Sequence, residues 1–146
     1  SASDRKRKTL PKVTEISVVT GLDAWLSGRL TGVKCMPETA AYVTGVLREH
    51  VLERPKSLTG VSLVIAFSEA CALGSFVHYQ RVGDHIVFLE TVFPQSIDRE
   101  HELIMSIGQL SYLACHRLMG RRWPVYQELA DRLPSLLRDV RQHLNT

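Results

Sequence analysis

Titratable side chains that could exchange protons with a substrate gather in the middle of the chain. They are His78, Asp84, His85 and Glu90, and imidazoles and carboxylates are the usual general acids and bases. On a helix that starts near Asp84, Glu90 lies almost two turns further on and does not share a face neatly with it. We therefore interpret Asp84 as a helix cap or a partner of Arg81, and the two histidines as partly exposed. A small enzyme with an acid/base site near Asp84, His85 and Glu90 is kept as a second alternative function.

The adjacent pair Cys115 and His116 could suggest a nucleophile with its base, or two metal ligands. Neighbouring residues on a helix point about 100° apart, so the two side chains cannot face each other. The chain also lacks the Cys-x-x-Cys and His-x-x-x-His spacings of zinc sites. We predict a core cysteine and a surface histidine, and we predict no catalytic residue, metal site, cofactor or small-molecule ligand. Three widely spaced cysteines favour a reducing cytoplasm over a disulfide framework.

Basic residues gather in two places, although the formal net charge of +3 is too small to indicate nucleic acid by itself. An N-terminal run and a second group near the last third are Arg5, Lys6, Arg7, Lys8, Arg117, Arg121 and Arg122. A basic arm can contact phosphates, and arginines beside an exposed Trp123 can stack on bases. Nucleic-acid binding through these residues is therefore the first alternative function.

Hydrophobic spacing predicts a helical domain over residues 13–146, preceded by a flexible basic arm at residues 1–12. The expected helices span about 22–30, 37–53, 57–73, 98–119 and 124–144, with Gly74 and Gly120 as stops and a kink or break at Pro134. Leu103, Ile107, Leu110, Ala114 and Leu118 form an apolar stripe on the fourth of these. The longest apolar region, 61–73, is too short to span a membrane.

Residues 76–93 can be interpreted in two ways, and the choice decides the fold class. A hairpin would turn at Gly83-Asp84, whereas a helix would be ended by Pro94. Residues 86–89 are four apolar residues in a row, which leaves a hairpin strand without a polar face. Val82, Ile86 and Leu89 lie on one helical stripe with Phe93. We therefore predict a helix, and keep an α+β fold with a hairpin as the alternative.

Four segments resemble an uncharacterised group of bacterial proteins. They are Arg81-Val82-Gly83-Asp84-His85-Ile86-Val87-Phe88-Leu89, Val92-Phe93-Pro94-Gln95-Ser96, Gly108-Gln109-Leu110-Ser111-Tyr112 and Val125-Tyr126-Gln127-Glu128-Leu129-Ala130 running on to Leu136. The resemblance covers residues 78–144 and departs from the group's pattern at Thr91, Gln95 and Ser111. It implies a mostly helical bundle and a bacterial or mobile-element source, and it implies no activity.

We predict an all-α protein with a single helical domain of about five or six helices. Trp25 and Trp123 are expected as core anchors, and either one becomes an interface candidate if it is exposed. Residues 57–73 are apolar on nearly all sides and are expected to be central to the core, with more need of cover than one domain offers. These features favour a non-enzymatic cytoplasmic binding protein that is a subunit of a homo-oligomer or a multiprotein complex.

Overall fold

The structure, a computed structural model of the chain, describes residues 21–53, 60–92 and 101–145. Residues 21–30 are helical, and they are followed by α2 (Pro37–Glu53), α3 (Gly60–Leu73), α4 (Phe76–Val92), α5 (His101–Met119), a 3-10 turn η2 (Gly120–Arg122) and α6 (Pro124–Leu144). No strand occurs in these ranges. The prediction of a single all-α domain is confirmed, and the alternative hairpin is wrong. The arm at residues 1–12 and the expected Pro94 stop lie outside the described residues.

Helix ends are set by local residues. Pro37 begins α2, where proline needs no hydrogen-bond acceptor for a backbone N–H. The N–H of Met36, just before that helix, donates to Glu128 Oε1 of α6 at 3.0 Å. Gly74 and Gly120 adopt left-handed φ values of 58° and 70° after α3 and α5, which glycine accepts without strain. Both glycines thus end their helices as the sequence predicted.

One uninterrupted helix, α4, occupies the segment that the sequence left ambiguous. It begins at Phe76, well before the start expected near Gly83 and Asp84. Asp84 therefore neither caps the helix nor lies on an exposed side, and that expectation is wrong. It lies in the middle of α4, where its side chain is part-buried by contacts with α2 and α5.

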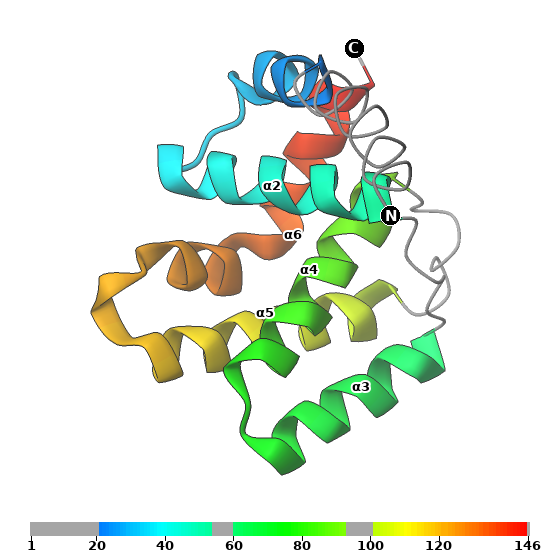
Figure 1. Cartoon of the computed structure of the whole chain (residues 1–146), viewed down its shortest axis with the longest axis vertical. Helices are drawn as coiled ribbons and strands as arrows, with labels where there is room; N and C mark the ends of the chain where they lie inside the picture. The colour runs from blue at the N-terminus through cyan, green and yellow to red at the C-terminus, as the bar shows by residue number, and fades with distance from the viewer. Residues whose placement is uncertain (1–20, 54–59, 93–100, 146) are drawn as a thin grey trace, which may run out of the picture.

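The helices surround α4, which runs through the middle of the domain with α2 on one side and α3 on the other (Figure 1). It packs against α2, α3, α5 and α6, whereas α3 packs chiefly against α4 and α5. The inner helix is thus covered from several sides, and α3 forms an outer edge of the domain.

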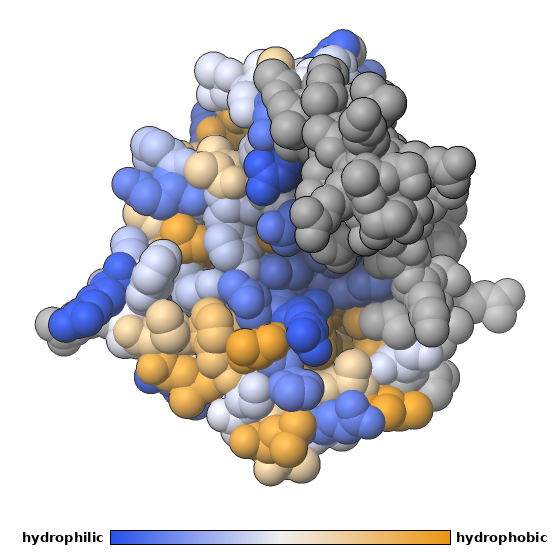
Figure 2. Space-filling view, in the orientation of Figure 1, coloured by the Kyte–Doolittle hydropathy of each residue, from blue (hydrophilic) through white to orange (hydrophobic). Residues whose placement is uncertain are grey.

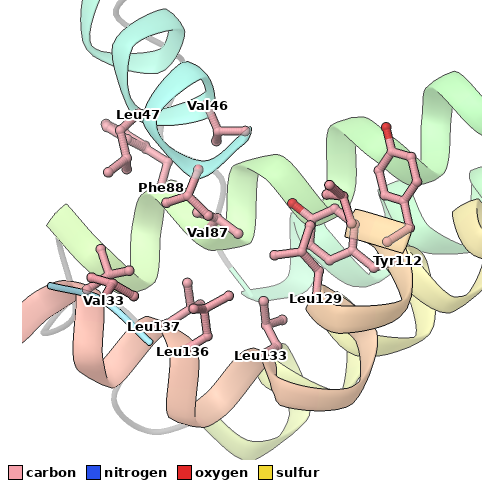
Figure 3. Close-up of a cluster of buried hydrophobic side chains, with 14 of the residues drawn as sticks. Val33, Val46, Leu47, Val87, Phe88, Tyr112, Leu129, Leu133, Leu136 and Leu137 are labelled. Atoms are coloured by element: carbon pink, nitrogen blue, oxygen red, sulfur yellow. The ribbon is translucent and has the colours of Figure 1, made fainter. Parts of the chain in front are cut away.

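Two hydrophobic clusters of unequal size hold the helices together. The larger one joins α2, α4, α5, α6 and residues 26–33, and Figure 3 shows Leu133, Leu136 and Leu137 of α6 facing Val87 and Phe88 of α4. The smaller cluster joins α3 to α4 and α5 through six buried residues, Leu63, Val82, Ile86, Leu89, Ile104 and Ile107. The part of the domain that carries α3 therefore has the thinner core.

The last helix continues through Pro134 from Pro124 to Leu144, so the break that the sequence allowed does not occur. Proline has no N–H, and it leaves the carbonyl four residues earlier without its usual helical donor. That carbonyl belongs to Ala130, and the side chain of Gln109 in α5 donates to it at 3.0 Å. A helix–helix hydrogen bond thus replaces the one that Pro134 removes.

Candidate functional site

A largely buried polar group is centred on Asp84. Its Oδ1 accepts hydrogen bonds from the hydroxyls of Tyr42 at 2.6 Å and Tyr112 at 2.7 Å. Tyr126 stacks on Tyr112, and its hydroxyl accepts a hydrogen bond from Gln80 Nε2 at 2.9 Å. The carboxylate thereby connects α2, α4 and α5, while the ring of Tyr126 adds α6.

The residue before Asp84 makes this arrangement possible. A β-carbon at Gly83 would lie 2.7 Å from Cζ of Tyr112 and less than 3.0 Å from both neighbouring ring carbons. Only glycine leaves room for the phenol to pass the backbone of α4 and reach Asp84. The Gly83-Asp84 pair thus accommodates an aromatic ring and holds its hydroxyl, and it makes no turn.

Burial decides the ionisation of this group. It raises the pKa of Asp84 to about 6, although the hydrogen bonds from Tyr42 and Tyr112 act in the opposite direction. Burial and the nearby Asp84 carboxyl raise the pKa of both tyrosines well above the usual phenol range. The tyrosines therefore remain hydrogen-bond donors at all physiological pH values. The two phenols thus hold the buried carboxyl in place between α2, α4 and α5.

The other residues of the expected acid/base group have different partners. His85 is buried beside the ring of His50, with the ring centres 5.7 Å apart, and burial lowers its pKa to about 4. Glu90 is completely buried, lies 3.0 Å from His101 Nδ1 and has Arg141 at 3.9 Å. The hydrogen bonds of Asp84 go to Tyr42 and Tyr112, whereas Glu90 contacts His101 and Arg141, so these two carboxyl groups have different partners among those described. The expectation that His85 is partly exposed is wrong.

The pair Cys115 and His116 is arranged as expected, with the cysteine fully buried and the histidine part-exposed. Among the described residues, no three His, Cys, Asp or Glu side chains are grouped so that they could hold a metal ion. None of the described helices is both long enough and apolar enough to cross a membrane.

A groove of about 610 Å³ lies between residues 21–31 and α2. Its charged walls are Asp23 and Arg48, whose side chains form an ion pair at 3.0 Å. The guanidinium and the carboxylate therefore satisfy each other. Among the described lining residues, this groove therefore offers no unpaired charge to a ligand.

An apolar surface on α3 is the most unusual feature of the exterior. All residues of this helix except serine and Glu69 are apolar or glycine, yet Leu63 and Ala70 are its buried hydrophobic side chains among those described. Ile65 is 55% exposed and Leu73 is 64% exposed. The expectation that neighbours bury this helix on most faces is wrong, because among the described helices it packs chiefly against α4 and α5 and its other side chains stay exposed.

The neighbouring surface of α5 is also apolar. Leu103, Leu110 and Leu118 belong to the stripe seen in the sequence, and each is about half exposed, at 51%, 50% and 52%. Of the residues in that stripe, Ile107 is the one that is buried. The helix mainly buries the adjacent face, which consists of Ile104, Met105, Ile107, Gly108, Ser111, Tyr112 and Cys115. The small residues on this buried face allow α6 and α4 to approach closely.

A groove of about 350 Å³ runs between these two helices. Phe67 and Cys71 of α3 line one side, and Leu110, Ala114 and Leu118 of α5 line the other. We call this groove, together with the exposed side chains Val64 and Leu103 that flank it on the two helices, the α3/α5 face. Figure 2 shows hydrophobic residues gathered over the lower half of the molecule, where α3 and the adjoining helix ends lie.

The interface candidates Trp25 and Trp123 are not core anchors, because they are 47% and 50% exposed. Trp25 carries the guanidinium of Arg29 over its ring at 5.4 Å. Trp123 lies between η2 and α6. Their exposure meets the condition under which the sequence favoured an interface.

Of the basic residues singled out in the sequence, Arg117 and Arg122 are exposed at the end of α5 and in η2. Arg117 also lines the apolar groove. The side chain of Arg121 and the run Arg5, Lys6, Arg7 and Lys8 lie outside the described part of the structure.

No family model matches the chain, and neither the curated proteins nor the solved structures contain a match to it.

Proposed function

We propose that this protein is a non-enzymatic binding protein that acts as a subunit of a homo-oligomer or a larger protein complex. The α3/α5 face is its association surface. The observation that carries this proposal is α3 itself, a mostly apolar helix that packs chiefly against α4 and α5 among the described elements and leaves several apolar side chains exposed. Helices of this composition are normally enclosed by other elements. A protein partner would supply the missing cover.

The energetics favour such a partner. Covering the exposed half of a leucine side chain contributes on the order of 1 kcal/mol, since full burial contributes about 1.5–3 kcal/mol. Val64 of α3 and the three half-exposed leucines of α5 lie on this surface. Together they would contribute several kcal/mol, which is enough to offset part of the entropic cost of association.

Sedimentation of the protein purified from cells that express it naturally tests this proposal. We expect an assembly larger than the 16.4 kDa monomer, and we expect the variant Leu110→Glu to be lost from it. Asp131→Arg is a suitable control, because Asp131 is exposed on α6 away from the α3/α5 face. A monomer that co-purifies with no partner would overturn the proposal.

The exposure of Trp123 next to Arg122 favours nucleic-acid binding as a second candidate function. A half-exposed indole can stack on a base while nearby guanidinium groups contact phosphates. Gel-shift affinity for single-stranded DNA and RNA should then fall when residues 1–8 are deleted or when Arg117, Arg121 and Arg122 are neutralised. Unchanged affinity in both variants would exclude this mode of binding.

A further inference from the structure

The exposed stripe of α5 is nearly symmetric along the helix. Leu110 lies close to its middle, with Leu103 seven residues before it and Leu118 eight residues after it. At about 1.5 Å per residue, the outer leucines lie roughly 11 Å from the central one. All three side chains are exposed to nearly the same extent. A stripe of this kind fits a copy of itself when one helix is turned end to end.

The charges beside the stripe have opposite signs at the two ends. Glu102 precedes Leu103 and Arg117 precedes Leu118, and both are exposed, so each charge points about 100° from its leucine on the same flank of the stripe. If a second α5 lies antiparallel with Leu110 at the two-fold axis, position 117 of one copy lies opposite position 103 of the other. Leu103 of one copy then faces Arg117 of the other copy. Glu102 directly precedes Leu103 in the sequence, so it lies near that arginine. A parallel arrangement would instead bring like charges together at both ends.

From this pattern, and given the proposed role of the α3/α5 face in association, we infer that its occupant is a second copy of this chain. The two copies are related by a two-fold axis near Leu110, and their α5 helices run antiparallel. Such an interface is self-complementary, because each contact between two residues occurs twice. The two symmetric contacts between Glu102 and Arg117 select the antiparallel orientation.

In this dimer α3 would complete a four-helix arrangement. Phe67 and Cys71 of α3 flank the groove in which Leu110 and Leu118 lie. A second α5 placed over the stripe would cover this groove, and α3 of each copy would border the joint layer. Antiparallel helices packed around a shared apolar seam form a stable bundle geometry. The thin cluster between α3, α4 and α5 would thereby gain cover on its outer side.

Sedimentation equilibrium of the purified full-length chain, without other proteins, tests the inference. We expect the mass to double with rising concentration. Glu102→Arg and Arg117→Glu should each weaken self-association by about tenfold, because each places two like-charged contacts in the dimer. The double variant Glu102→Arg/Arg117→Glu should recover most of the lost affinity, since it restores both pairs with their signs exchanged. Asp131→Arg, on α6, should leave the affinity unchanged.

Two results would overturn the inference. One is a monomer at every concentration up to several hundred micromolar, and the other is a double variant as weak as the two single variants combined. Neither result removes the proposed association role if the assembly from natural cells contains a different protein that is lost with Leu110→Glu. Failure of the second-copy inference is therefore distinguishable from failure of the proposed function.

Discussion

The phenol end of Tyr112 lies against the backbone of Gly83, where an added β-carbon would come within 2.7 Å of its Cζ. Tyr112 is fully buried, and its hydroxyl is held by Asp84, so the ring cannot move aside without losing that hydrogen bond. This contact explains why a glycine occupies the middle of α4, where it is otherwise unfavourable.

The variant Gly83→Ala should therefore be less stable than the natural protein, against the usual helix preference for alanine. We expect a loss of about 2 kcal/mol in the free energy of unfolding, as is typical for an overpacked core. Gly45→Ala in α2 is the matched control, because a β-carbon there meets nothing within 4 Å. The free energy of unfolding of Gly45→Ala should rise by about 1 kcal/mol. Urea unfolding of both variants checks the prediction, and equal gains would contradict it.

Asp84 should make the protein less stable as the pH rises. Its pKa is raised from 3.8 to about 6 in the folded protein, so the folded state binds the proton more tightly. The stability from this group is present below pH 3.8 and is lost as the pH rises through about 6. The loss amounts to roughly 3 kcal/mol for a shift of this size. In Asp84→Asn, the free energy of unfolding should not show this loss between pH 4 and pH 7. If the variant has the same pH profile as the natural protein, the attribution of the loss to Asp84 is contradicted.

His85 should have the opposite effect on stability over much the same pH range. Its pKa is lowered from 6.5 to about 4, so the unfolded chain binds the proton more tightly. The stability from the neutral imidazole is present above pH 6.5 and is lost as the pH falls through about 4. The variant His85→Gln should therefore be less sensitive to acid than the natural protein in thermal unfolding scans. Equal acid sensitivity of the two proteins would show that His85 is protonated in the fold.

The hydrogen bond from Gln109 to the Ala130 carbonyl should matter only while Pro134 is present. Replacing Gln109 with methionine removes the donor to a buried carbonyl, which should cost about 1–2 kcal/mol. In a Pro134→Ala background the backbone N–H of residue 134 can donate to Ala130, and the same replacement should cost less. A double-mutant cycle of unfolding free energies measures this coupling. Strictly additive effects would contradict it.

Much of the helical structure could be predicted because its signals are local. Pro37, Gly74, Gly120 and Pro124 mark helix ends through backbone geometry that depends on few neighbours. The role of Asp84 could not be predicted in this way, since its partners Tyr42 and Tyr112 come from distant helices. Periodicity could identify an aspartate on a helix, and it could not show that two phenols would bury it.

The proposed association surface was only partly visible in the sequence. The run 57–73 indicated a need for extra cover, and that signal led to the prediction of a partner. On α5, however, Leu103 and Leu110 continue into an apolar face that includes Ile104 and Ile107. Spacing alone cannot show which part of so broad a face the domain buries. Only the position of α3 beside α5 shows where the exposed part lies.

The reactivity of Cys71 provides the most direct measurement of the central claim, the association role of the α3/α5 face. This thiol is exposed and lines the groove, whereas Cys115 is buried and serves as an internal control. In the assembly isolated from natural cells, we predict that Cys71 reacts with iodoacetamide at least tenfold more slowly than in the dissociated chain, while Cys115 reacts slowly in both. Equal alkylation rates for Cys71 in the two states would contradict the account.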